Sequence, residues 1–225
     1  MKESGLELIE QRTVQVPAAR YVLEGDLGVP AHARGVVLFA HGSGSSRFSA
    51  RNRHVATLLQ EHGFATLLLD LLTPNEEELD RLSGEYRFDI GRLAERLVGA
   101  SEWLASEDST ATLALSMFGA STGGGAAFVA AAELPERVAA VVSRGGRPDL
   151  AGDALERVVA PTLLIVGGND DVVLELNRAA LARLRATARL EVIPGATHLF
   201  EEPGTLDEVA RHAAAWFETY ASRGS

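Results

Sequence analysis

The sequence predicts an α/β fold with a mostly parallel, eight-stranded sheet and helices on both faces. Short runs rich in Val, Leu and Ile recur along the chain, and stretches with helical spacing separate them. Continuous apolar runs of this length are typical of parallel strands that are buried on both faces. Strands that alternate with helices favour right-handed crossovers, which place helices on both sides of one sheet. Because the chain has no internal repeat and no Gly-, Ser- or Pro-rich linker, residues 1–225 are predicted to form one domain.

Six of the predicted strands are continuous apolar runs, and two are alternating. The six runs are GVVLFA (35–40), FATLLLD (64–70), TLALSMF (112–118), VAAVVS (138–143), TLLIVGG (162–168) and RLEVIP (189–194). The two alternating stretches, residues 6–16 and 19–27, come first and are joined at Pro17, which predicts an antiparallel start to the sheet.

Two stretches between the strands are singled out. Residues 89–105 place Leu93, Leu97 and Leu104 at helical spacing, which predicts an amphipathic helix. The acidic stretch 71–87 contains Pro74 and is predicted to be irregular. It is too short for a cap domain, so the fold is expected to lack a large cap, and this stretch is expected to border the site.

Composition excludes several classes of function. The net charge is -10 and no stripe of Lys and Arg is present, so nucleic acid is not an expected partner. The chain contains no apolar run long enough to span a bilayer and no secretory signal, so no membrane partner is expected and the predicted location is cytoplasmic. The absence of cysteine excludes disulfides, thiolate metal sites and a cysteine nucleophile. Oligomeric state cannot be read from these features.

The strongest local motif is GASTG, residues 119–123, between a predicted strand and a predicted helix that begins at Thr122. A nucleophile elbow needs this order because its sharp turn lifts the serine hydroxyl above the sheet edge. We expect Gly119 and Gly123 to be small because the strand and helix backbones pass closely there. A chance match in a chain with 22 glycines is the alternative, but the flanking elements favour Ser121 as the nucleophile. Gly124 and Gly125 are costly within a helix, and they either permit close packing or are merely tolerated.

A serine nucleophile needs an imidazole base, and the base needs a carboxylate that fixes its tautomer. Of the six histidines, only His198 follows a late strand in a Gly-containing loop. This position favours a catalytic over a structural role for His198. Asp170 and Asp171 both follow the strand 162–168 and compete for the role of the acid. We favour Asp170, because Asp171 directly precedes a helical segment and is expected to cap it.

The segment HGSGSS, residues 41–46, follows the strand 35–40 and is the candidate for the second oxyanion donor. A Gly-rich turn lets backbone N–H groups approach a substrate carbonyl without side-chain obstruction. We assign the oxyanion hole to the N–H groups of Ser43 and Thr122, with Gly42 as the alternative to Ser43. Taken alone, the segment is better explained as a plain Gly-rich turn, so the assignment depends on the other motifs.

With HGSGSS, GASTG, GGNDDVV (167–173) and GATHLF (195–200) in place, the chain resembles the α/β-hydrolase superfamily along nearly its whole length. The chain order Ser, Asp, His is the order of that fold. The compact form and SRGGRPDL (143–150) resemble the dienelactone hydrolase-like group, which includes hydrolase domains fused to phosphoribosyltransferases. Dienelactone hydrolases proper use a cysteine where this sequence has Ser121. The resemblance therefore implies ester rather than lactone hydrolysis, by acyl transfer without a metal or organic cofactor.

The expected substrate is a small molecule, a small or short-chain ester bound in an open pocket. Phe48, Leu199 and Phe200 are candidate apolar walls, although core packing explains them about as well. Arg144 ends the strand 138–143 on the side where open α/β sheets bind ligands, so it is predicted to hold a substrate carboxylate; pairing with surface acids is its alternative. Arg47, Arg51 and Arg53 are weaker candidates for holding this carboxylate and are expected to form a solvated helix face.

Two other functions stay open at the level of sequence. The first is a non-catalytic ligand-binding or partner domain that keeps the fold without its chemistry. The second is a thioesterase, amidase or carbon–carbon hydrolase, since these enzymes share the same catalytic residues.

Overall fold

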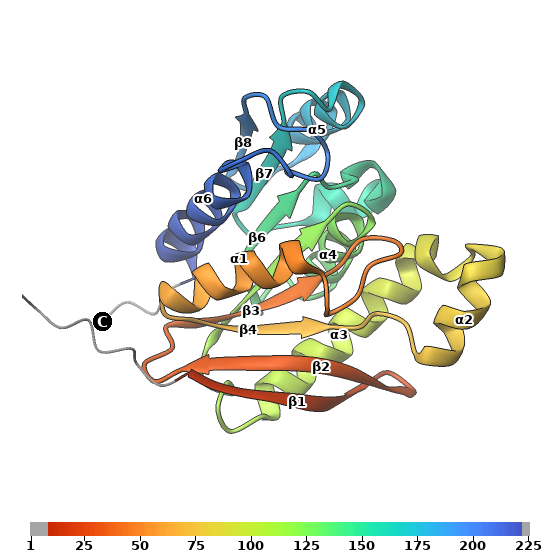
Figure 1. Cartoon of the computed structure of the whole chain (residues 1–225), viewed down its shortest axis with the longest axis vertical. Coiled ribbons are helices and arrows are strands. Elements are labelled where there is room, and N and C mark those ends of the chain that lie inside the picture. The colour runs from red at the N-terminus through yellow and green to blue at the C-terminus, as the bar shows by residue number, and fades with distance from the viewer. Residues whose placement is uncertain (1–8, 222–225) are drawn as a thin grey trace, which may run out of the picture.

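A computed structural model describes residues 9–221, in which all eight strands belong to one sheet (Figure 1). The strand order is β1-β2-β4-β3-β5-β6-β7-β8. The pairs β1–β2 and β2–β4 are antiparallel, and every other pair is parallel. The strands are β1 (Ile9–Ala18), β2 (Tyr21–Pro30), β3 (Gly35–Ala40), β4 (Phe64–Leu69), β5 (Ala114–Ala120), β6 (Val138–Arg144), β7 (Thr162–Gly167) and β8 (Ala188–Ile193). The predicted sheet, with its antiparallel start, is confirmed.

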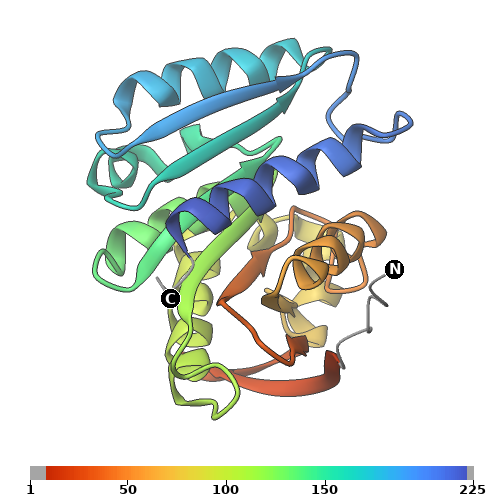
Figure 2. The ribbon, with the colours of Figure 1, turned by 90° about the vertical axis from the view of Figure 1, so that its left-hand side faces the viewer.

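The helices cover both faces of this sheet, as predicted (Figures 1 and 2). One apolar cluster packs α1 and α6 against one face, and another packs α3, α4 and part of α5 against the other. The α-helices are α1 (Ala50–Glu61), α2 (Pro74–Ser83), α3 (Ile90–Ser106), α4 (Thr122–Glu133), α5 (Asp171–Arg183) and α6 (Thr205–Tyr220), and the two 3-10 segments are η1 (Tyr86–Phe88) and η2 (Pro148–Arg157). The helix predicted at 89–105 is α3, and Asp89 caps it.

The turn between the first two strands differs from its prediction. Pro17 lies inside β1 and pairs with Val22, while the chain turns at Ala19 and Arg20. Ala19 has a φ of 53°, in the left-handed region that a tight turn between twisted strands requires. Residues 6–8 of the predicted first strand lie outside the described residues.

The stretch 71–87 is more regular than its prediction, because it contains α2. Thr73 and Glu76 form a capping box, and Pro74 occupies the first turn, where a missing N–H is harmless. Gly84 ends the helix in the left-handed conformation, with a φ of 71°. This short helix stands beside the carboxyl ends of the strands, and no large cap accompanies it in residues 9–221 (Figure 1). No helix within those residues is long and apolar enough to cross a membrane.

Candidate active site

Ser121 occupies a strained turn between β5 and α4. Its φ of 51° and ψ of -123° are unfavourable for a residue with a side chain. Two backbone hydrogen bonds hold the turn, from Ser121 N–H to the Arg144 carbonyl (3.3 Å) and from Arg147 N–H to the Ser121 carbonyl (3.0 Å). A conformation that the surrounding backbone enforces at a serine is typical of a nucleophile elbow.

The glycines around Ser121 permit close backbone approach. A Cβ on Gly119 would lie 2.5 Å from the Gly124 Cα, so β5 and α4 touch as predicted. A Cβ on Gly123 would lie 2.2 Å from the Ala40 carbonyl oxygen, so this glycine serves contact with the end of β3 rather than with β5. Both contacts involve backbone atoms, which cannot move aside for a side chain. The elbow therefore depends on glycine at both positions.

Asp170 and His198 are joined by a short hydrogen bond. His198 Nδ1 lies 2.6 Å from Asp170 Oδ2, and the exposed fractions of the two side chains are 38% and 14%. The His198 ring also lies against Gly145, where a Cβ would stand 3.5 Å from the ring Nδ1. Because Gly145 follows Arg144, whose carbonyl binds Ser121 N–H, the histidine loop and the elbow contact the same short segment after β6.

The competing acid, Asp171, has a different place from the one predicted. Asp170 occupies the N-cap position of α5 but makes no side-chain capping bond, since its carboxylate faces His198. Asp171 is the first residue inside the helix rather than its cap. It acts there as a negative charge near the positive end of the helix dipole.

The loop after β3 brings Ser43 beside Thr122. Ser43 N–H donates to Thr122 Oγ1 at 2.8 Å, so in this structure that N–H is engaged by the threonine hydroxyl. Gly42 packs directly on the elbow, where a Cβ would lie 3.0 Å from the Ser121 Cβ. The two predicted oxyanion donors are therefore neighbours, and a ligand oxygen would have to replace Thr122 Oγ1 as the acceptor of Ser43 N–H.

His41 ties this loop to the end of β4. Its Nε2 accepts a hydrogen bond from Leu71 N–H at 3.0 Å, and its Nδ1 donates to the Gly42 carbonyl at 2.9 Å. Burial lowers the pKa of His41, against the opposing effects of the Gly42 carbonyl and of nearby Asp70 and Glu77. The ring is therefore neutral near pH 7, with its proton on Nδ1.

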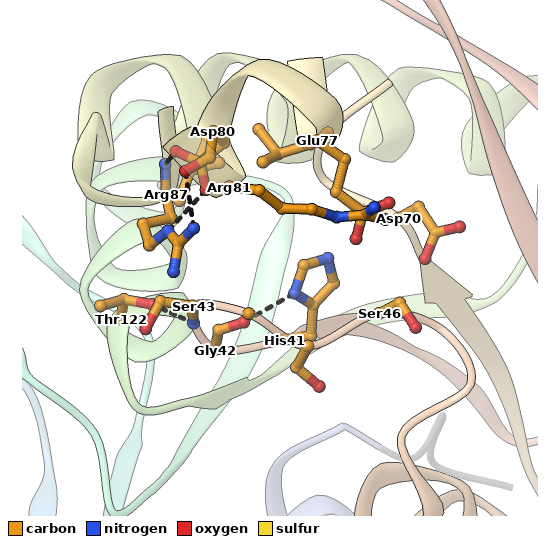
Figure 3. Close-up of a pocket in the computed structure, with 14 residues that line it drawn as sticks. His41, Gly42, Ser43, Ser46, Asp70, Glu77, Asp80, Arg81, Arg87 and Thr122 are labelled. Carbon is orange, nitrogen blue, oxygen red and sulfur yellow. Dashed lines mark hydrogen bonds and ion pairs between the residues drawn. The ribbon is translucent and has the colours of Figure 1, made fainter. Parts of the chain in front are cut away.

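A cavity of about 310 Å³ opens between this loop and α2 (Figure 3). The lining includes the predicted oxyanion residues and also side chains that were not predicted to belong to the site. These lining residues are His41, Gly42, Ser43, Gly44, Ser45, Ser46, Asp70, Leu72, Glu77, Asp80, Arg81, Arg87, Leu93 and Thr122. The capping box at Thr73 and the helix-ending Gly84 are the signals that could have revealed α2, and with it this wall.

Charged side chains of α2 and η1 reach over the loop in Figure 3. Asp80 is almost fully buried, accepts from the N–H groups of Tyr86 and Arg87, and forms an ion pair with the Arg87 guanidinium. Burial alone would raise the pKa of Asp80, but these bonds outweigh it and lower the pKa. Arg81 extends across the cavity and makes no ion pair among the described residues.

The predicted apolar walls do not border the cavity beside Ser43. The exposed fractions of Phe48 and Leu199 are 57% and 40%, and Phe200 is buried in the core beneath the histidine loop. None of the three lines the cavity beside Ser43. For Phe200 the alternative of core packing applies, whereas Phe48 and Leu199 as apolar walls stay predictions.

Arg144 is buried, with an exposed fraction of 7%, and faces α1 and Phe200 rather than the cavity. Within residues 9–221 it has no carboxylate partner, so pairing with surface acids is not its role. That it binds a substrate carboxylate stays a prediction.

Arg47 is not part of a solvated helix face, contrary to its prediction. It precedes α1, is largely buried, and forms ion pairs with Glu24 and Asp70.

Residues 23–221 match the family model of the dienelactone hydrolase family. The chain belongs to the dienelactone hydrolase family. It is 58% identical to a dienelactone hydrolase from Anabaena variabilis ATCC 29413, whose crystal structure matches with a TM-score of 0.93 over 95% of this chain and 99% of that one. The Pyrococcus furiosus esterase Pf2001, at 15% identity and a TM-score of 0.76 over 95% of this chain and 94% of that one, shares the fold.

Two proteins of Mycobacterium tuberculosis, from strains CDC 1551 and H37Rv, are 59% identical over 209 residues. Both are named "Putative phosphoribosyl transferase". The match covers 93% of this chain but 46% of each relative, so the chain spans about half the length of these relatives. The family match and the fold agree, and both group this chain with proteins of the dienelactone hydrolase type.

Proposed function

We propose that this protein is a serine hydrolase that cleaves small or short-chain carboxylic esters through an acyl-enzyme on Ser121. The observation that carries the proposal is the combination of a strained serine elbow with the 2.6 Å bond between His198 and Asp170, both against the segment after β6. The chain order Ser121, Asp170, His198, with each residue following a strand, matches the requirements of triad chemistry.

In the proposed reaction, Ser121 Oγ attacks the ester carbon while His198 Nε2 accepts its proton. Asp170 holds the imidazole with the proton on Nδ1, which leaves Nε2 free to act as the base. His198 then returns the proton to the departing alcohol. A water molecule attacks the acyl-enzyme by the same path and releases the acid. Apart from this water molecule, the proposed steps use only residues of this chain.

The tetrahedral intermediate carries a negative oxygen that two backbone N–H groups can stabilise. Thr122 N–H lies at the start of α4, where the helix dipole favours negative charge. Ser43 N–H is the second donor once Thr122 Oγ1 rotates away from it. The proposed hole is therefore completed by substrate, which replaces the threonine hydroxyl as the acceptor.

Phosphoribosyl transfer is not proposed for this chain. That name belongs to proteins about twice as long, and the matching 209 residues necessarily include most of the dienelactone hydrolase region. A cavity of about 310 Å³ beside Ser43 and Thr122 supports small substrate groups. Thioesters and amides could use the same residues, so they belong in the substrate panel.

The test is labelling by a fluorophosphonate, followed by turnover of p-nitrophenyl esters, a thioester and an amide. We expect Ser121→Ala to abolish labelling and to lower kcat by several orders of magnitude with the fold intact, because triad residues act as a unit. Ser116→Ala, at a buried serine within β5, is the matched control and should label normally. Equal labelling of Ser121→Ala and the wild type would refute the proposal, and an inert wild type would favour a non-catalytic domain.

A further inference from the structure

Arg144 is a buried cation, and no acidic side chain within residues 9–221 pairs with it. Its Nε and Nη1 make no hydrogen bond to the described part of the chain, and its Nη2 reaches Asn52 Oδ1 only at 3.4 Å. Burial, with a smaller effect from the positive charge of Arg51, lowers the pKa of Arg144 to about 10. The guanidinium is therefore charged near pH 7, and two of its three nitrogen atoms donate to nothing in residues 9–221.

The surroundings of Arg144 add positive charge instead of neutralising it. Arg51 belongs to the first turn of α1, and its Nε is also buried without a partner. The nearby Glu201 binds Arg51 Nη1 at 3.1 Å from the solvent side, with an exposed fraction of 64%, and does not reach Arg144. The first turn of α1 carries no acidic side chain, and the helix dipole there is positive.

Burying an unpaired charge is strongly unfavourable, and so is burying N–H donors that bind nothing. One small negative ligand would remove both penalties, since the unbonded donors come from two guanidinium groups on neighbouring elements. We propose that Arg144 and Arg51, with Asn52 orienting the Arg144 guanidinium, form a binding site for a small anion, a halide or a carboxylate. This proposal does not depend on the proposed esterase activity.

The site lies beneath the candidate catalytic groups. The guanidinium carbon of Arg144 is 5.9 Å from the centre of the Phe200 ring, in the loop that carries His198. The Arg144 carbonyl accepts from Ser121 N–H, and the next residue, Gly145, lies against the His198 ring. A bound anion therefore neutralises a charge at the base of both the elbow and the histidine loop. The anion is either a free ion or the carboxylate of a substrate.

The first arm of the test measures free ions on the full chain. Thermal unfolding and chloride-35 NMR line widths are recorded as chloride, bromide or acetate replaces a bulky buffer anion at constant ionic strength. We expect the wild-type Tm to rise with ion concentration as a single site requires, and the chloride line to broaden until acetate displaces the chloride. Arg144→Met should lose both responses, and Arg51→Met should bind at least tenfold more weakly.

The matched control is Arg178→Met, which removes a solvent-exposed arginine from α5 and should respond as the wild type does. The second arm compares esters with and without a free carboxylate on the acyl side. A tenfold or larger rise in KM for the charged ester alone, in Arg144→Met, identifies substrate as the source of the anion. The Arg51→Met data keep the test decisive if Arg144→Met does not fold.

Two results would overturn the proposal. In the first, the wild type shows no saturable response to any of the three ions, and substitution of Arg51 or Arg144 changes the KM of the charged and the neutral ester equally. The other is an ion response in Arg144→Met equal to that of the wild type. Failure of the esterase proposal is distinguishable from failure of this one, because the melting and NMR measurements of ion binding need no turnover.

Discussion

Two carboxylates each bind a side-chain nitrogen at a similar distance, Asp170 that of His198 and Glu76 that of Arg96, but the surroundings of the two pairs differ. Asp170 and His198 lie 2.6 Å apart with exposed fractions of 14% and 38%, between the loops that follow β7 and β8. Glu76 and Arg96 lie 2.5 Å apart with exposed fractions of 10% and 1%, between α2 and α3. The first pair is partly exposed to solvent, whereas the second is buried and connects α2 to α3.

The residue types and exposures of the two pairs distinguish a pair suited to catalysis from a pair that stabilises the fold. A histidine can accept and return a proton, as the proposed reaction requires of His198, but an arginine stays charged, so the Glu76–Arg96 pair can only stabilise. Burial alone would raise the pKa of Glu76, but hydrogen bonds from Arg96 and Thr73 outweigh burial and lower the pKa. Arg144 is a third case, a buried arginine whose counter-charge does not come from residues 9–221.

The largest expected effect separates the two pairs by activity. Asp170→Asn should lower kcat on a turned-over ester by about three to four orders of magnitude, because the amide favours the wrong imidazole tautomer. The free energy of unfolding should change little, since the side chains of this pair are partly open to solvent. Steady-state kinetics and urea unfolding measure the two quantities. A kcat within tenfold of the wild type would remove Asp170 from the proposed triad.

The second effect is on stability. Glu76→Ala leaves the Arg96 charge buried without its partner and should lower the free energy of unfolding by about 3–5 kcal/mol. Urea unfolding measures this loss, and Glu78→Ala, at an exposed residue of the same helix, is the control. Replacing both partners by Leu and Met should recover most of the loss. A loss below about 1 kcal/mol in Glu76→Ala would mean that this pair does not anchor α2.

A smaller effect is the pH dependence of stability. The folded pKa of Glu76 lies below its ordinary value of 4.5, so its stabilisation is present above pH 4.5 and is lost as pH falls through the folded pKa. Urea midpoints measured downward from pH 4.5 should therefore fall less steeply in Glu76→Ala than in the wild type. Parallel profiles for the two proteins would contradict the assignment of a charged Glu76–Arg96 pair.

The smallest effect concerns Asp171. As the first residue of α5 it lies near the positive end of the helix dipole, so Asp171→Asn should lower the free energy of unfolding by about 0.3–1 kcal/mol. It should leave kcat within twofold of the wild type, in contrast to Asp170→Asn. The same two measurements check it, and a kcat loss comparable to that of Asp170→Asn would move the acid to Asp171.

Much of this molecule was readable from local sequence, because the signals are local. Apolar runs such as 35–40 and 162–168 mark buried strands, and GASTG between a strand and a helix marks the elbow. The helix α2 was equally readable, since Thr73, Glu76 and Gly84 carry its start and stop signals. It was missed because Pro74 was taken as a sign of irregular chain instead of the first turn of a helix.

The tertiary structure alone decided what depends on residues far apart in the chain. Gly124 and Gly125 have no local reason, but a Cβ at either would lie about 3 Å from the backbone of Gly146 or Arg147, where α4 packs on the segment after β6. No sequence pattern tells that Arg144 faces Arg51 and lacks an acid, because β6 and α1 meet only when the sheet assembles. Strand and helix formation follow from neighbours in sequence, whereas close packing and charge balance follow from neighbours in space.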